Sequence, residues 1–281
     1  MSNHHFTIYN TTGDFSPTTT DHLVIEVAAN HFAGMVVKEN KQSIEAFELF
    51  NFAKEVEISL EDILQEVFSK SSIVKPHYAG IHIHINDEYC VPVPVRLFDE
   101  DLSVDYLNAV VGEYYNSDVF TEYLTVMPGI VNVFRISKTN RQLLDQKFHG
   151  AVYHHSNTTL IKRMMSNTSD THIDVIALQF YNTFFKACVM KEGEFNLIQS
   201  FEYETPEDVL YHLLNIQQRL ELQSSVVLQV SGLINTEFQI YREIIKFFKN
   251  IVFDDFVSAS IPSGNANTPA FYFSPFLNLA V

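Results

Sequence analysis

Two histidines alternate within a short apolar segment of the chain, at His82 and His84. In an extended strand, residues two apart project from the same face, so the two imidazole rings would lie side by side. Imidazole nitrogens bind transition metals, and Asp87 or Glu88 could add a carboxylate ligand. The pattern is therefore compatible with a metal-dependent enzyme. A half-buried strand that simply exposes its polar residues would read the same way, so both interpretations stay open.

Signatures of other chemistry are missing from the sequence. There is no G-x-S-x-G nucleophile motif, no G-x-x-x-x-G-K-[ST] phosphate loop and no G-x-G-x-x-G fingerprint. The two cysteines, Cys90 and Cys188, are too few for a four-cysteine zinc site or a disulfide framework. We therefore assign no catalytic residue from the sequence and expect a binding protein rather than an enzyme.

The balance of acidic and basic residues indicates which kinds of partner the protein could bind. The chain carries 34 acidic and 18 basic residues, a formal net charge of −16. Nucleic-acid binding needs clustered Lys and Arg to displace counterions from phosphates, and no such cluster exists. No run approaches the ~18 apolar residues of a membrane span, and the start of the chain lacks the pattern of a signal peptide. We expect a cytoplasmic protein without nucleic-acid binding or membrane insertion.

The order of predicted elements repeats along the chain with an offset of about 150 residues. Apolar and polar residues alternate as in strands, and two segments match amphipathic helices that begin at Ser59 and Thr205. The first copy reads strand, strand, strand, helix, strand over residues 22–85, and the second copy repeats that order over residues 174–230. The sequence thus predicts an α/β protein of two tandem lobes, each a mixed sheet with helices on its faces.

Composition suggests where the lobes begin and end. Residues 1–20 are rich in Ser, Thr and Asn and are expected to form a loose leader. The first lobe, with a bridging segment, is predicted over residues 21–165, and the second lobe over residues 171–281. The polar run between them marks the boundary. An apolar stretch, Phe271–Leu277, predicts a final core strand or a docking surface for a partner.

Two such halves in tandem resemble the actin-like ATPase superfamily, whose lobes are ribonuclease H-like. More closely, the chain resembles an uncharacterised family of Bacteroidetes proteins, a domain of unknown function with that fold. The resemblance rests on the strand pair Leu23–Val37, the segments Val91–Asp99 and Phe134–Phe148, and the strand pair Phe180–Met190. It spans nearly the whole chain, and its motifs are hydrophobic patterns more than chemical signatures.

The superfamily resemblance implies a site for ATP built on two β-hairpins that cradle phosphates. In each hairpin an acidic residue handles Mg²⁺ or the attacking water, and a nearby glycine lets backbone N–H groups approach phosphate. The resemblance places Glu26 as the acid of the first hairpin, but Ala28 stands in the glycine position. In the second hairpin, Ala177 and Gln179 supply neither group. The hairpins are therefore degenerate.

The sequence leaves three functions open. The degenerate hairpins favour a non-catalytic actin-like protein that binds an unknown protein partner and needs no cofactor. The first alternative is a nucleotide-binding protein or weak ATPase, with ATP and Mg²⁺ held by Glu26, Ala28, Asn30, Ser231 and Gly232. The second alternative is the metal-dependent enzyme with His82 and His84 as ligands.

The alternation of residues also predicts how Glu26 behaves. It falls on the polar side of a strand that we expect to be half-buried, so its carboxylate should be exposed. A surface substitution usually shifts stability by less than ~0.5 kcal/mol, so Glu26→Ala is expected to leave stability nearly unchanged.

Overall fold

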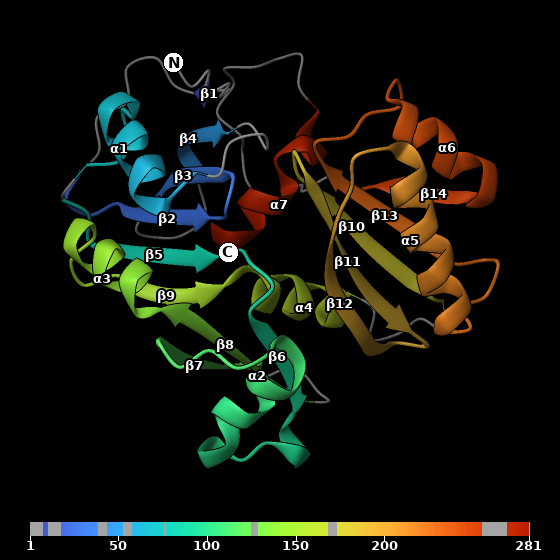
Figure 1. Cartoon of the computed structure of the whole chain (residues 1–281). Helices are drawn as coiled ribbons and strands as arrows, with labels where there is room; N and C mark the ends of the chain where they lie inside the picture. The colour runs from blue at the N-terminus through green and yellow to red at the C-terminus, as the bar shows by residue number, and fades with distance from the viewer. Residues whose placement is uncertain are drawn as a thin grey trace. The chain divides into compact units, whose positions relative to one another are not determined.

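The computed structural model describes residues 8–10, 18–38, 44–52, 58–75, 77–124, 129–167, 173–254 and 269–280. The chain forms two compact units (Figure 1), each described separately below. Unit 1 contains the described residues up to Thr158 together with residues 276–280, and unit 2 contains residues 159–254 and 269–275. The lobe boundaries expected from the sequence, at residues 165 and 171, stay a prediction.

The main sheet of unit 1 has the strand order β1-β4-β3-β2-β5-β9. Strand β2 lies at its centre, antiparallel to β3 and parallel to β5, which is in turn parallel to β9. Part of the expected leader, residues 8–10, forms the edge strand β1 and pairs with β4, while residues 1–7 and 11–17 lie outside the described residues. The strands are β1 (Ile8–Asn10), β2 (His22–Val27), β3 (His31–Val37), β4 (Ile44–Asn51), β5 (Gly80–Ile85) and β9 (Val152–His155).

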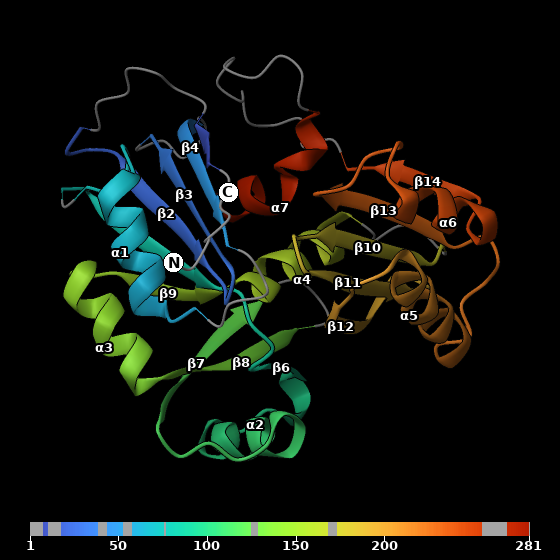
Figure 2. The same cartoon turned by 45° about the horizontal axis from the view of Figure 1, so that its top comes forward.

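Strand β2 is covered on both faces. Leu23, Ile25 and Val27 pack with residues of α1 (Leu60–Lys70) and α3 (Lys138–Lys147), two helices that lie side by side in Figure 2. The chain's C-terminal segment contributes Phe276, whose ring lies 5.8 Å from that of His31 and 5.6 Å from that of Phe47. Burial of both faces explains why nearly every residue of β2 is buried, whatever its polarity.

The C-terminal apolar run is helical rather than extended. It forms η3 (Ala270–Tyr272), α7 (Ser274–Leu277) and η4 (Asn278–Ala280), and Phe276 and Leu277 are each 1% exposed. The predicted strand at this position is therefore wrong, although the burial expected for the run is present.

The chain forms a smaller sheet in the stretch of sequence that separates β5 from β9, drawn in green in Figure 1. It consists of β6 (Cys90–Pro94), β7 (Ser117–Leu124) and β8 (Ile130–Ser137) in the order β6-β8-β7. Helix α2 (Ser103–Val111) covers one face, where Leu107 packs on Val93, Val131 and Val133. The segment expected to bridge the lobes thus supplies the central strand of this sheet and, in β9, the last strand of the main sheet.

Unit 2 repeats the plan of unit 1. Its sheet has the order β12-β11-β10-β13-β14, in which β10 is antiparallel to β11 and parallel to β13, just as β2 relates to β3 and β5. Two helices, α5 and α6, pack on the hydrophobic core that this sheet of unit 2 forms (Figure 2). The elements are β10 (Val175–Phe180), β11 (Phe184–Lys191), β12 (Glu194–Glu202), α5 (Pro206–Arg219), β13 (Val227–Gly232), α6 (Gln239–Phe247) and β14 (Asn250–Phe253), preceded by α4 (Ser156–Asn167).

Local sequence signals place several of these elements correctly. Ser59 caps α1 and Thr205 caps α5, each within a capping box completed by an aspartate at the third helical position. The two mixed sheets with packed helices confirm the predicted α/β fold. In the part of the chain that the structure describes, no helix is long and apolar enough to cross a membrane.

Candidate functional site

Glu26 is completely buried near the end of β2, with an exposed fraction of 0%. Its Oε1 lies 2.7 Å from Nε2 of His31, the first residue of β3, and accepts a hydrogen bond of 3.0 Å from Nδ2 of Asn86, the residue after β5. The expectation that Glu26 is exposed is wrong, because Phe276 covers His31 on the face that the sequence pattern left open. The carboxylate therefore ties three chain segments together.

The turn between β2 and β3 contains the other two residues expected at the first phosphate hairpin. The backbone N–H of Ala28 donates to the carbonyl oxygen of His31 at 3.0 Å, and the carbonyl oxygen of Asn30 accepts from Phe52 N–H at 2.8 Å. Ala28 is 8% exposed. These backbone groups stabilise the turn itself, and a nucleotide role for Glu26, Ala28 and Asn30 stays a prediction.

Ser231 and Gly232, expected on the adenosine side, lie in unit 2 at the end of β13. The hydroxyl of Ser231 donates to the carbonyl oxygen of Leu178 in β10 at 3.2 Å. Gly232 has a φ of +85°, and a Cβ there would meet the carbonyl oxygen of Phe180 at 2.1 Å. Both residues thus serve the close approach of β13 to β10, which explains why a glycine is needed.

His82 and His84 share one face of β5, as the alternation predicts, and there they meet His154 of β9. The ring of His154 stacks on both, with centroids 5.3 Å and 4.9 Å away, and its Nε2 lies 3.1 Å from Nδ1 of His82. On its other side, Nδ1 of His154 lies 2.8 Å from Glu122. Within the described part of the chain, no three His, Cys, Asp or Glu side chains are arranged to hold a metal ion.

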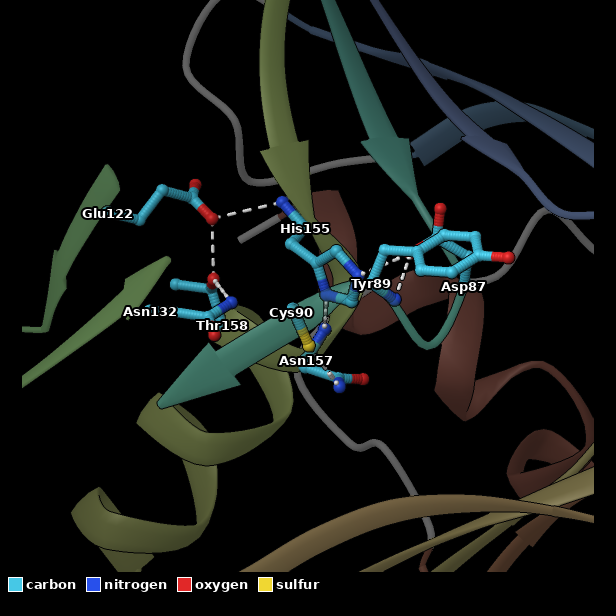
Figure 3. Close-up of polar contacts among 8 residues, drawn as sticks. All are labelled: Asp87, Tyr89, Cys90, Glu122, Asn132, His155, Asn157 and Thr158. Carbon is cyan, nitrogen blue, oxygen red and sulfur yellow. Dashed lines mark hydrogen bonds and ion pairs between the residues drawn. The ribbon is translucent and has the colours of Figure 1, made fainter. Parts of the chain in front are cut away.

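A polar cluster lies beside these histidines, where β5 and β6 meet the start of α4 (Figure 3). Nε2 of the fully buried His155 is 3.2 Å from Oδ1 of Asp87, and Asn157 donates from its backbone N–H to Nδ1 of His155 at 3.2 Å. The Asn157 amide also donates to the sulfur of Cys90 at 3.0 Å.

Glu122 of β7 anchors the other end of this cluster. Its carboxylate accepts from the hydroxyl of Thr158 at 2.5 Å and from the backbone N–H of His155 at 3.0 Å, besides its contact with His154. Thr158 in turn accepts from the amide of Asn132 at 2.8 Å. Burial would raise the pKa of Glu122, but the hydrogen bonds from His154, Thr158 and His155 outweigh burial and lower it. The cluster joins the small sheet to the main sheet.

A cavity of about 580 Å³ opens in unit 1 between the main sheet and the small sheet. Its walls come from the ends of β2 and β5, the starts of α1 and α3, and the segment after α2. Most of the lining is apolar. The residues that line the cavity include Ala28, Ala29, Ile58, Leu60, Ile63, Ile85, Asn86, Asp87, Tyr89, Glu113, Tyr114, Arg135, Ile136 and Ser137.

Arg135 supplies the positive charge of the cavity wall. Its guanidinium donates to the carbonyl oxygens of Gly112 at 2.9 Å and Val111 at 3.3 Å, at the C-terminal end of α2, where the helix dipole favours a cation. The guanidinium carbon also lies 5.3 Å from the ring centre of Tyr89 and 5.5 Å from that of Tyr114. With 5% of the residue exposed, the side chain is held in one place.

Asn86 belongs to the same wall, but its Oδ1 is buried rather than exposed to the cavity. Because Nδ2 donates to Glu26, Oδ1 must face elsewhere, and it has no partner among the described residues. Asn86 is 3% exposed, and a buried acceptor without a partner costs free energy. Sequence reasoning missed both Asn86 and Arg135, although an arginine inside the apolar run of β8 is a signal of an unusual environment.

Comparisons with known proteins agree on the fold. A family model described as "Protein of unknown function (DUF3822)" matches residues 10–251. A solved structure from Bacteroides thetaiotaomicron VPI-5482, described as a protein with actin-like ATPase fold and unknown function, has a TM-score of 0.73 and 20% identity, covering 87% of this chain and 94% of that one. A chain of the PilM-PilN type IV pilus biogenesis complex has a TM-score of 0.60 and 10% identity, covering 94% and 98%. No curated protein matches in sequence. The expected actin-like ATPase fold is confirmed.

Replacing Glu26 with alanine is expected to destabilise the protein by about 3 kcal/mol or more, because His31 and Asn86 would lose their buried partner. Glu26→Gln, which keeps the shape, should cost less. Glu66→Ala is the matched control, because the Glu66 carboxylate forms a half-exposed pair with Lys70 and its loss should cost less than ~0.5 kcal/mol. Urea unfolding measures all three variants, and a loss of under ~0.5 kcal/mol for Glu26→Ala would contradict the buried network.

The lowered pKa of Glu122 predicts a dependence of stability on acid. A carboxyl whose folded pKa lies below its unfolded value of about 4.3 adds stability above that pH, and this stability is lost as pH falls through the folded pKa. Between about pH 6 and pH 3, wild type should therefore lose more unfolding free energy than Glu122→Gln. The exposed Glu88→Gln is the control and should follow wild type. Parallel curves for wild type and Glu122→Gln would refute the assignment.

Proposed function

The chain belongs to the family of proteins of unknown function, DUF3822, that its sequence matches. We propose that it is a non-catalytic actin-like protein that binds a partner protein. A short segment of the partner occupies the cavity of unit 1. The formal charge of −16 disfavours nucleic acid as the partner.

The observation that carries the proposal is the composition of the cavity wall. Apolar side chains such as Ile58, Leu60 and Ile63 surround one fixed polar group, the donor guanidinium of Arg135. A peptide segment offers complementary groups for both, in apolar side chains and in a carbonyl or carboxylate oxygen. The volume of about 580 Å³ falls in the range of sites that enclose small ligands or short segments.

Two polar side chains of the lining, those of Asp87 and Ser137, are already engaged within the fold, which argues against catalysis by them. Oδ1 of Asp87 lies against His155 and accepts from the backbone N–H of Tyr89 at 2.9 Å. The hydroxyl of Ser137 caps α3 by accepting from the N–H of Asn140 at 3.1 Å. A catalytic nucleophile needs a base within hydrogen-bond reach, and the bonds that this serine makes supply none.

A protein of the same fold supports the proposal by analogy. One chain of similar structure is part of the PilM-PilN type IV pilus biogenesis complex, so the fold occurs in a protein that works within an assembly. Because fold alone does not fix function, the proposed binding of a partner is supported chiefly by the cavity of this chain.

A nucleotide is the second candidate ligand, because Ala28 and Ala29 of the first hairpin turn also line the cavity. Against it, the methyl group of Ala28 stands where the resemblance requires close approach of phosphate to the backbone. A ligand at a hundredfold excess over its Kd stabilises the folded state by roughly 2.7 kcal/mol, which thermal unfolding detects readily. Mg-ATP at millimolar concentration is the probe for this alternative.

Panning a random heptapeptide display library on the full chain is expected to enrich binding peptides. Ala29→Trp, at an exposed position of the lining, should weaken their binding at least ~tenfold by filling the cavity. Val152→Trp, on the edge strand and 50% exposed outside the lining, should leave binding unchanged. Fluorescence anisotropy with the enriched peptides measures the affinity of both variants. In a separate measurement, Mg-ATP should not raise the melting temperature of the wild-type protein.

Two results would overturn the proposal. Failure to enrich any peptide, or equal binding by wild type and Ala29→Trp, would remove the cavity as a binding site for a partner segment. A rise in melting temperature of several degrees with Mg-ATP but not with AMP would favour the nucleotide-binding alternative instead.

A further inference from the structure

We propose that the cavity selects its partner segment by a carboxylate, which binds the guanidinium of Arg135. This inference rests on the proposed function and specifies the chemistry of the segment. The carboxylate belongs either to the C-terminus of the partner chain or to an Asp or Glu side chain flanked by apolar residues.

The charge of Arg135 has no carboxylate partner within the described residues. Its hydrogen bonds go to the carbonyl oxygens of Val111 and Gly112, which carry only partial charge. The two acidic residues of the lining are engaged elsewhere: Asp87 with His155, and Glu113 with the hydroxyl of Tyr115. A cation buried without a full counter-charge is costly, and a ligand carboxylate would supply the missing charge.

The guanidinium also keeps donors for a ligand. It carries five N–H groups in a planar fork, and its bonds to the two carbonyls use one on each terminal nitrogen. The rings of Tyr89 and Tyr114 lie within 5.5 Å of it, so its plane is fixed before a ligand arrives. A planar, preorganised fork of donors matches the two oxygens of a carboxylate.

The surroundings favour a singly charged carboxylate over a phosphate. Asp87 and Glu113 also line the cavity, and their negative charges would repel a dianion more strongly than a monoanion. Ile58, Leu60 and Ile63 require apolar side chains next to the charged group.

Two peptide libraries identify the source of the carboxylate. One displays random heptapeptides with free C-termini, and the other displays them with the C-terminus fused to the carrier, so that only side-chain carboxylates are available. We expect the peptides enriched on the full wild-type chain to share a carboxylate beside apolar residues. Enrichment only from the first library assigns the C-terminus, and enrichment from both assigns an Asp or Glu side chain.

The decisive comparison pairs each enriched peptide with a copy in which that carboxylate is an amide. On wild type, amidation should weaken binding by at least ~tenfold, and on Arg135→Gln the acid and the amide should bind alike. Arg135→Lys, which keeps the charge but not the fork, should retain part of the preference and serves if Arg135→Gln fails to fold. Arg96→Gln, an exposed arginine of the small-sheet segment, is the control and should behave as wild type.

The outcomes separate this inference from the proposed function. Enriched peptides that lack a carboxylate, or whose acid and amide forms bind wild type equally, would overturn the inference while segment binding stands. An undiminished preference for the acid form in both Arg135 variants would also overturn it. No enrichment from either library would refute the proposed function itself.

Discussion

The arrangement of unit 1 around its cavity depends on how the chain accommodates one buried charge. Glu26 lies in a central strand that is covered on both faces, where an unpaired carboxylate would be strongly unfavourable. Its Oε1 contacts His31 and Asn86, while Oε2 has no partner among the described residues. The two contacts of Oε1 partly offset the cost of burial and hold the start of β3 and the residue after β5 against the end of β2. Since the turn after β2 and the segment after β5 both line the cavity, the pairing of Glu26 fixes two of its walls.

The same contact bears on function. The resemblance predicted Glu26 to be an acid that handles Mg²⁺ or water; in the structure its carboxylate contacts a histidine and an amide inside the protein. Arg135 of β8 and Tyr114, which follows α2, also line the cavity. A cation on the small-sheet side, with apolar walls around it, suits the recognition of a peptide segment.

Local signals predicted much of the fold. The alternation in β2, β3, β10 and β11 and the caps Ser59 and Thr205 depend on neighbours in sequence, so periodicity and capping preferences were sufficient to place those elements. The candidate site depends on contacts between distant segments. The burial of Glu26 could not be predicted because Phe276, which covers its partner His31, comes from the other end of the chain. The placement of Asn86 and Arg135 in one cavity required the inserted sheet, whose strand β7 lacks a strong apolar pattern.

The most direct test of binding in the cavity is nuclear magnetic resonance of isoleucine methyl groups during titration with an enriched peptide. Ile58, Ile63, Ile85 and Ile136 line the cavity, whereas Ile176 and Ile244 belong to the core of unit 2. We expect the methyl signals of the first group to shift in proportion to peptide bound, those of the second group to stay in place, and Mg-ATP to move neither. Shifts centred on Ile176 and Ile244, or shifts with Mg-ATP and none with peptide, would contradict the account.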